Sequence, residues 1–328
     1  MAFSEGTGEV FGLIFKVLTV IVLVLTMLGF LASSSAQCEM LVNYRMQLAV
    51  VSIIVFILFI VTKSWIWVLV AAVPLFINLM EVGPCYALSR TAPRGADSKS
   101  ISFYIVNVKL ENEQIDEIIN GIELEDADVV FLQEITEQWK VLLGRELGET
   151  YRHVCMYPDE DGYGRGVLSK LPLFDGKIVD LGENASPCLV VKTKVLDHTL
   201  TVFGVQLTSA TNGERQAARD EELAELTELV KGTDGLVAVL GSVAASTWSP
   251  ALKKLQADTG LLDARKGFGV QPTWPTYLPG LQIPIDHCLL GEGITATSVR
   301  RGSACGSDHY PLFVEVVITG TETLERIR

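Results

Sequence analysis

Three apolar runs before residue 90 constrain the fold of this chain more than any other feature. They cover residues 11–32, 47–62 and 65–80, and Lys16 is the only charged residue within them. A helix needs about 20 predominantly apolar residues to cross a bilayer. The first run reaches that length alone, and the other two reach it if they include neighbouring residues. We therefore predict a membrane region over residues 1–88, with three transmembrane helices and the lipid bilayer as its partner.

The third run has features typical of a membrane helix. It begins with Trp65 and Trp67, and tryptophan is enriched at membrane–water interfaces. Pro74 predicts a kink, which membrane helices tolerate. A cleaved signal peptide would explain the first run, but it lacks a clear cleavage site and leaves the other two runs unexplained. A buried helical hairpin would explain the second and third runs and leave the first unexplained.

The remainder of the chain is strongly acidic. Three basic and four acidic residues give positions 1–89 a net charge of −1, which leaves −12 of the total −13 for residues 90–328. A domain with this charge repels the phosphate backbone of nucleic acids. We therefore expect no nucleic-acid partner.

The acidic part has the pattern of an α/β domain. Residues 89–100 are rich in Ser, Pro and Gly and are predicted to form a linker, residues 101–320 the domain, and residues 321–328 a tail. The predicted strands cover residues 101–108, 127–134, 165–174, 188–196, 200–207, 235–241, 285–290 and 306–318. Helical spacing of apolar residues occurs over 115–122 and 136–147, and a charged helix is predicted over residues 213–231. The strands fall into two sets, one in each half of the domain, and each set is accompanied by helices. This arrangement predicts a layered α/β sandwich.

Five polar residues stand beside or within these apolar strands: Asn107, Glu134, Asp286, Asp308 and His309. Each has an ordinary structural explanation when it is taken singly. For example, Asn107 could be a cap, Glu134 a residue at the start of a helix, and His309 a hydrogen-bonded imidazole on the surface. Their joint order along the chain is what indicates a functional site.

That order resembles the endonuclease/exonuclease/phosphatase superfamily over residues 100–318. The matching motifs are "YIVNV", "DVVFLQEIT", "GVLSKLPL", "IDHCLL" and "GSDHYPL". Three preceding membrane helices make the chain similar to the membrane-anchored bacterial branch that includes vancomycin/teicoplanin-resistance-type proteins. The resemblance implies a four-layer α/β sandwich that hydrolyses phosphoesters with a divalent metal. It also implies a multi-pass protein of the bacterial inner (plasma) membrane, with an extracytoplasmic domain.

The resemblance implies a role for each of the five residues. Glu134 would be the main carboxylate of the metal, and Asn107 would help to position the metal or the phosphate. Asp308 would support the metal side. Asp286 would orient His309, which would contact the phosphate and stabilise its developing charge. Magnesium suits such oxygen ligands, because it keeps several waters and needs few carboxylates.

Four positions depart from the family pattern. The family has Gly-Asp-Phe/Leu-Asn after a buried strand, and this chain has Ser242 for the aspartate and Ala244 for the asparagine. That aspartate activates or positions the attacking water, and that asparagine holds the phosphate. Gln206 stands where the family commonly has a phosphate-binding histidine. The arginine common before "IDH" is also missing, with Pro284 near its place.

These departures predict a protein that has lost catalysis. Asp286 and His309 would be vestigial, and Glu134, Asp308 and Asn107 would hold a metal weakly or not at all. No cofactor is predicted unless the site still functions, in which case it is Mg²⁺. The protein would then act as a membrane-anchored binding or structural module, with membrane-protein partner subunits, for example as an accessory subunit of a respiratory or photosynthetic complex.

Two other functions remain open. One is an active, divalent-metal-dependent phosphatase or phosphodiesterase on membrane or lipid-linked phosphoesters. The other is a sensor that binds a phosphate group without cleaving it.

The side of the membrane that carries the domain has opposing indications. Basic residues on the domain side favour a cytoplasmic domain by the positive-inside rule: Arg45, Arg90, Arg94 and Lys99. The six cysteines would allow three disulfides in an oxidising compartment, and free buried thiols are the alternative. Together with the family resemblance, the cysteines lead us to predict an extracytoplasmic domain.

Overall fold

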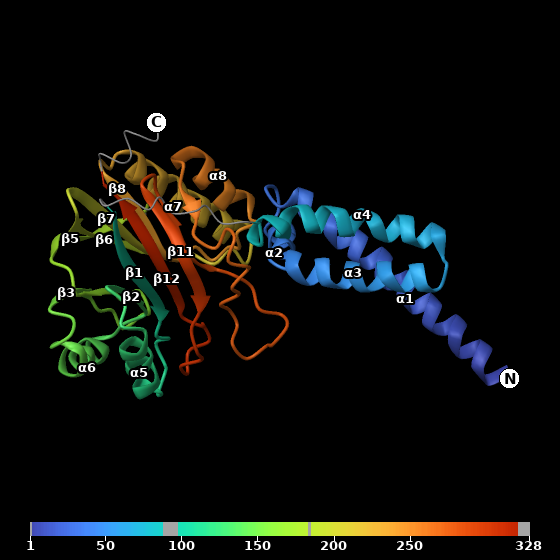
Figure 1. Cartoon of the computed structure of the whole chain (residues 1–328), viewed down its shortest axis with the longest axis horizontal. Coiled ribbons are helices and arrows are strands. Elements are labelled where there is room, and N and C mark those ends of the chain that lie inside the picture. The colour runs from blue at the N-terminus through green and yellow to red at the C-terminus, as the bar shows by residue number, and fades with distance from the viewer. Residues whose placement is uncertain (1, 88–97, 183–184, 321–328) are drawn as a thin grey trace.

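The computed structural model describes residues 2–87, 98–182 and 185–320, with side chains from residue 9 onward. Of the predicted linker only residues 98–100 are described, as the start of a strand, and the predicted tail lies outside the described residues. The chain forms a helical part and an α/β part that meet end to end (Figure 1).

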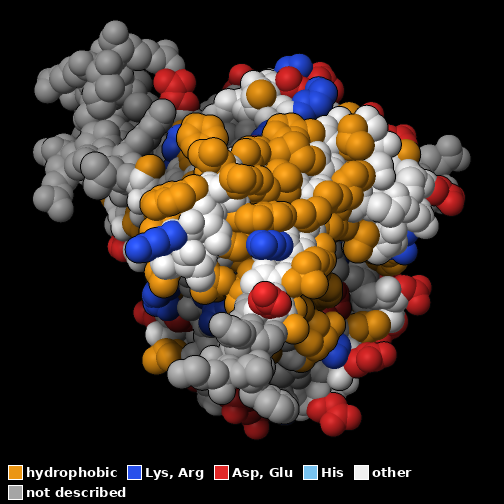
Figure 2. All heavy atoms as spheres, turned by 90° about the vertical axis from the view of Figure 1, so that its right-hand side faces the viewer, with side chains coloured by type: hydrophobic (Ala, Val, Ile, Leu, Met, Phe, Trp, Pro, Cys, Tyr) orange, Lys and Arg blue, Asp and Glu red, His pale blue; other side chains and the backbone are white. Residues whose placement is uncertain are grey.

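The helical part contains three long helices and one short one. Its elements are α1 (Ala2–Leu28), η1 (Gly29–Leu31), α2 (Ala36–Val42), α3 (Arg45–Val61), α4 (Trp65–Val82) and η2 (Gly83–Cys85). Val55, Phe59 and Ala71 are buried where the long helices pack together. Many large apolar side chains point outward from the long helices, and hydrophobic side chains gather at the centre of the face shown in Figure 2.

Two stretches, Glu9–Leu31 and Trp65–Cys85, are long and apolar enough to cross a membrane by themselves. Helices α2 and α3 meet at a bend of 60° and qualify only if the bent pair counts as one span. The described residues therefore contain two candidate spans, or three with the bent pair, and three spans remain a prediction. Helix α2 was not predicted; its N-cap is Ser35, whose Oγ accepts a hydrogen bond from Cys38 N at 3.5 Å.

The α/β part has two six-stranded sheets. The first has the order β11-β12-β1-β2-β4-β3, with β1 (Ser98–Asn107), β2 (Val129–Gln133), β3 (His153–Tyr157), β4 (Arg165–Ser169), β11 (Ile294–Arg301) and β12 (Leu312–Thr319). The second has the order β5-β6-β7-β8-β10-β9, with β5 (Leu173–Asp180), β6 (Pro187–Val195), β7 (His198–Gln206), β8 (Leu236–Ser242), β9 (Leu262–Asp263) and β10 (Asp286–Leu290). The helices are α5 (Ile115–Glu125), α6 (Glu137–Leu147), α7 (Gly213–Lys231) and α8 (Pro250–Thr259).

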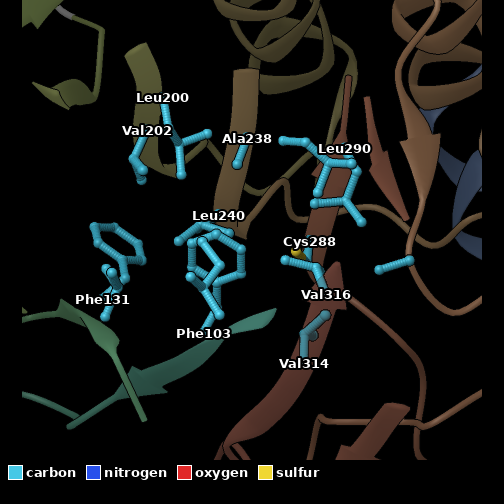
Figure 3. Close-up of a cluster of buried hydrophobic side chains, with 14 of the residues drawn as sticks. Phe103, Phe131, Leu200, Val202, Ala238, Leu240, Cys288, Leu290, Val314 and Val316 are labelled. Carbon is cyan, nitrogen blue, oxygen red and sulfur yellow. The ribbon is translucent and has the colours of Figure 1, made fainter. Parts of the chain in front are cut away.

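The two sheets pack face to face around a buried apolar core. Phe103 of β1 and Phe131 of β2 lie against Leu240 of β8 in this core (Figure 3). Alternate residues of the strands point the other way, so that Tyr104 packs under α5 and α6, and Val239 packs under α7 and α8. The helix–sheet–sheet–helix order confirms the predicted layered α/β sandwich.

Gly204 of β7 allows the sheets to approach closely. A Cβ atom built at this position would lie 2.2 Å from Cε2 of Phe131. The ring of Phe131 therefore fills the space that a side chain on β7 would need.

One predicted strand was wrong in extent. Residues 165–174 form parts of two strands, because β4 belongs to the first sheet and β5 to the second. The chain changes sheet around Pro172, and Leu171 N donates to Ser169 Oγ at 3.0 Å in this turn. Proline lacks the N–H that a continuous strand would use, so the break has a local cause.

The cysteines do not form the disulfides that we considered. All six lie in the described residues, and all six are free thiols. Burial raises the pKa of Cys188 to about 12 and that of Cys305 to about 11. Both are therefore protonated at neutral pH, as inert buried thiols are.

Candidate functional site

The predicted site residues meet because strand ends from both sheets lie at one edge of the sandwich. Parallel pairing of β1 with β2 places Asn107 beside Gln133, the residue before Glu134. Parallel pairing of β7 with β8 places Gln206 beside Ser242, and antiparallel β10 places Asp286 on the other side of Ser242.

Glu134 lies at the centre of a hydrogen-bonded group that joins the two sheets. Its Oε1 accepts from Asn107 Nδ2 at 2.7 Å and from Gln206 Nε2 at 2.8 Å. Its Oε2 accepts from Leu110 N at 3.0 Å. The backbone of Glu134 has φ +64°, an uncommon value outside glycine, and this turn brings the carboxylate to its donors. Three N–H groups therefore occupy the carboxylate.

Asp286 and His309 form a buried pair. His309 Nδ1 lies 2.8 Å from Asp286 Oδ2, and Asp286 N donates to Thr273 Oγ1 at 3.3 Å. Burial acts to lower the pKa of His309, but Asp286 raises it more, so the net shift is upward. Burial likewise acts to raise the pKa of Asp286, and His309 reverses the shift to a net lowering. The pair favours the charged form of both groups.

Asp308 lies away from the Glu134 group. Its Oδ2 accepts from Trp274 Nε1 at 3.1 Å, and its backbone oxygen accepts from Thr276 N at 2.9 Å. These contacts tie Asp308 to the loop before β10. Asp308 therefore has hydrogen-bond partners different from those of Glu134.

Glu134 is the one carboxylate in its hydrogen-bonded group with Asn107, Gln206 and Leu110. Within the described part of the chain, no three His, Cys, Asp or Glu residues are grouped so that they could hold a metal ion. Amide N–H groups of Asn107 and Gln206 point at the carboxylate of Glu134, where a cation would require oxygen ligands instead. The orientation of Asn107 is also fixed by its Oδ1, which accepts from Lys109 N at 2.8 Å.

The loop after β8 keeps its turn without the acidic and amide side chains of the family. Ser242 Oγ accepts from Ala244 N at 3.3 Å, and Ala244 has φ +51°. Asparagine adopts such a left-handed conformation more readily than alanine. The backbone conformation at Ala244 therefore suits the asparagine that the family pattern has at this position.

Two residues that sequence reasoning missed hold this edge together. Gln133 Oε1 accepts from Ser242 N at 3.0 Å and so links the two sheets. Arg165 is fully buried, and its Nη2 donates to the backbone oxygen of Gln206 at 3.3 Å. Burial lowers the pKa of Arg165 to about 10, so it is still charged at neutral pH. An arginine that begins the otherwise apolar strand "RGVLS" was a signal that could have found it.

A second missed group lies behind the loop. His287 Nε2 lies 2.8 Å from the backbone oxygen of Ala245, and His287 Nδ1 lies 2.9 Å from Arg265 Nη1. Because arginine only donates, Nδ1 is the acceptor and the Nε2 proton goes to the loop. Burial acts to raise the pKa of the nearby Asp263, but the charge of Arg265 and the hydroxyl of Thr247 bring it well below its usual range. Asp286 and His287 are neighbours in the "IDH" motif but contact different groups, because Asp286 pairs with His309 whereas His287 contacts Ala245 and Arg265.

The site opens into a cavity of about 360 Å³. The domain lines it with residues of the strand-end site, including Gln206, Ser242, Ala244, Trp274 and His309. The helical part lines the opposite side with Glu39, Met40, Asn43 and Tyr44. This second wall was not predicted, because nothing in the local sequence of α2 indicates contact with residues 200 positions later.

Comparisons with known proteins give the same architecture. The sequence profile of the Endonuclease/Exonuclease/phosphatase family matches residues 106–309. An endonuclease/exonuclease/phosphatase from Beutenbergia cavernae DSM 12333 is 15% identical with a TM-score of 0.55, over 68% of this chain and 72% of that chain. D. rerio TDP2 complexed with single-strand DNA product is 15% identical with a TM-score of 0.54, over 66% of this chain and 99% of that chain.

A third similar structure is that of a functionally unknown conserved protein from Enterococcus faecalis V583. It is 16% identical with a TM-score of 0.54, over 66% of this chain and 99% of that chain. At these identities the likeness shows the fold alone. No curated protein matches the chain.

Proposed function

The chain belongs to the endonuclease/exonuclease/phosphatase family, and we propose that it is a membrane-integrated member that binds through this fold without hydrolysing phosphoesters. The observation that carries the proposal is the state of Glu134. Its carboxylate accepts three N–H groups, one of them from Gln206, which stands in place of an imidazole. The family's central metal ligand is used here as a structural link between the sheets.

The expected loss of catalysis is large. Neither Ser242 nor Ala244 can take a proton from water near neutral pH, and a positioned general base is worth about 10²–10⁴-fold in rate. One lost electrostatic contact to the developing charge costs about 10²–10³-fold. Such effects are not additive, but together they remove most of the rate.

A second function, metal-dependent hydrolysis of membrane or lipid-linked phosphoesters, has one observation in its favour. The Asp286–His309 pair keeps the geometry of a phosphate-contacting imidazole, with Nδ1 and Oδ2 2.8 Å apart. A hydrolase would also need a water-activating group and a metal site, for which Mg²⁺ is the expected ion.

Turnover on a broad phosphoester panel with Mg²⁺ or Mn²⁺ separates the two functions. We expect negligible turnover for the native protein and for Glu134→Ala. The triple change Ser242→Asp, Ala244→Asn and Gln206→His should raise any activity more than each change alone, because such groups work as a unit. Gln138→His, on the exposed face of α6, is the matched control. Metal-dependent turnover of the native protein that Glu134→Ala abolishes would overturn the proposal.

We further propose that the protein is an accessory subunit of a larger membrane assembly, for example a respiratory or photosynthetic one. Large apolar side chains that remain exposed on the long helices support this, because they can pack against partner helices as well as lipid. Purification in mild detergent should yield a stoichiometric complex with other membrane proteins. Recovery of the protein alone under conditions that preserve known complexes would contradict this role.

The proposed location is a bacterial inner membrane, crossed several times, with an extracytoplasmic domain. Cys38 on α2 is partly exposed and lies next to the domain, so it reports the side. A membrane-impermeant thiol reagent should label intact cells, and a variant with both Cys38→Ser and Cys155→Ser, the two partly exposed cysteines, should lose that label. Labelling that appears only after lysis would place the domain in the cytoplasm.

A further inference from the structure

The helical part does more than carry the domain, because α2 forms one wall of the site's cavity. Met40, Asn43 and Tyr44 face the same cavity as Ser242 and His309. The wall and the strand-end site are separated by about 200 residues in sequence, and the cavity exists only because the two parts are docked.

The wall is fixed in place by Glu39, which is buried on α2. Its carboxylate accepts from Arg219 Nη2 at 2.7 and 2.9 Å, and from Gln216 Nε2 at 2.7 Å. Ser249 Oγ also donates to it. Because Arg219 is fully buried and paired, Glu39 and Arg219 largely neutralise each other at the edge of the cavity.

Further contacts tie the helical part to the loop that follows β8. Asn43 Oδ1 accepts from Ser246 N at 3.1 Å, and Trp248 Nε1 donates to the backbone oxygen of Glu81 at 3.1 Å. The loop that carries Ala244 is thus attached to α2 and to the end of α4. These hydrogen bonds hold the cavity wall in a fixed position relative to the domain.

The position of α2 places the cavity at the bilayer surface. The candidate spans end at Leu31 and Cys85, on the side of the domain, and α2 lies directly after the first of them. Figure 1 shows α2 at the junction between the long helices and the domain. Met40 lines the cavity and is also exposed, so the cavity wall continues to the outer surface of this junction.

The chemistry of the cavity suits a phosphate group attached to an apolar tail. His309 is buried, lines the cavity, and has Nδ1 occupied by Asp286, which leaves Nε2 without a partner among the described residues. The rest of the lining is mainly apolar or neutral, including Met40, Ile283 and Ile285.

We propose that this cavity binds the phosphodiester headgroup of a bilayer lipid, with the phosphate against His309 and the glycerol end against α2. The inference rests on the proposed function, because the bound lipid is held and not cleaved. The α2 wall acts as the element that selects a lipid over a soluble phosphate ester, since it places the open side of the cavity at the headgroup layer.

The test uses the full chain in detergent and native mass spectrometry after exchange with defined lipids. Phosphatidylglycerol should be retained at least tenfold better than diacylglycerol, which lacks the phosphate. His309→Gln should reduce phosphatidylglycerol retention about 10- to 100-fold, as expected for a lost hydrogen bond to a charged group. Tyr44→Ala should reduce it as well, and Gln37→Ala, on the exposed side of α2, should not.

Several outcomes would overturn the inference. These are equal retention of diacylglycerol, equal binding of soluble glycerol phosphate, or unchanged retention in both His309→Gln and Tyr44→Ala with their folding confirmed by thermal unfolding. The mass of the bound lipid distinguishes this inference from the proposed function. A cleaved lipid would refute the absence of hydrolysis and keep the lipid site, whereas no lipid and no turnover would refute the lipid site alone.

Discussion

Glu39→Gln is the perturbation that most directly tests how the helical part and the domain are joined. Glu39 and Arg219 have exposed fractions of 4% and 0%, and Arg219 Nη2 contacts both oxygens of Glu39. Glutamine keeps the shape but has one oxygen for donors from Arg219, Gln216 and Ser249. Its NH₂ group would then face another donor, and Arg219 would keep only the partly exposed Asp220 as an ionic partner.

Removing one member of a buried ion pair typically costs about 3–5 kcal/mol of unfolding free energy. For a domain of this size each kcal/mol corresponds to about 2–4 °C in the unfolding midpoint. We therefore expect Glu39→Gln to lower the midpoint by roughly 6–20 °C. The assay is thermal unfolding of the full chain in detergent, followed by tryptophan fluorescence, because Trp248 lies at this junction.

Glu137→Gln is the matched control, because Glu137 pairs with Lys140 on the exposed surface of α6. An exposed pair contributes about 0–1 kcal/mol, so this change should move the midpoint little. The double variant Glu39→Met with Arg219→Leu should recover part of the loss, since apolar replacement of both partners removes the unpaired charge. Equal midpoints for Glu39→Gln and Glu137→Gln would show that the junction does not depend on this ion pair.

Three further predictions concern the domain. Ala244→Asn should raise the unfolding free energy by about 1 kcal/mol, because asparagine tolerates φ +51° better than alanine. The control Ala224→Asn, on the exposed face of α7, should lower the unfolding free energy by about 0.7 kcal/mol or less. Denaturant titration measures both changes, and the same sign for both would contradict this prediction. Gly204→Ala should lower the unfolding free energy by about 1–3 kcal/mol, because its Cβ atom would lie 2.2 Å from Phe131. Gly144→Ala in α6, whose Cβ atom would meet nothing within 4 Å, should raise the unfolding free energy by up to about 1 kcal/mol. A Gly204→Ala variant more stable than the native protein would refute the close packing of the sheets. The raised pKa of His309 stabilises the folded protein below about pH 6.5, and this stability is lost as the pH rises through the pKa of His309 in the folded state. The lowered pKa of Asp286 stabilises the folded protein above about pH 3.9, and this stability is lost as the pH falls through the pKa of Asp286 in the folded state. Thermal midpoints from pH 3 to 9 should therefore fall on both sides of that window in the native protein and lose the alkaline part in His309→Gln; parallel pH profiles would rule out this assignment.

Much of the domain could be predicted because its signals are local. Apolar, β-rich runs identified most strands, and the charged segment at 213–231 was predicted as a helix with the observed bounds. The family resemblance assigned Asn107 and Glu134 to one site, and the parallel pairing of β1 with β2 explains how the two residues come into contact. The apolar runs likewise identified the candidate membrane spans of the first part of the chain, because their length and apolar composition are local properties of the sequence.

Only the tertiary structure decided what these residues contact. The use of Glu134 as an acceptor for Gln206 depends on the packing of one sheet on the other, which no local pattern encodes. The separation of residues 165–174 into two sheets depends on which neighbours each half pairs with. The wall of the cavity is the clearest case, since Glu39 of a short polar segment is held by donors about 180 to 210 positions away. Contacts at such separations arise from the assembled surfaces of both parts, and the sequence of either part alone carries no sign of them.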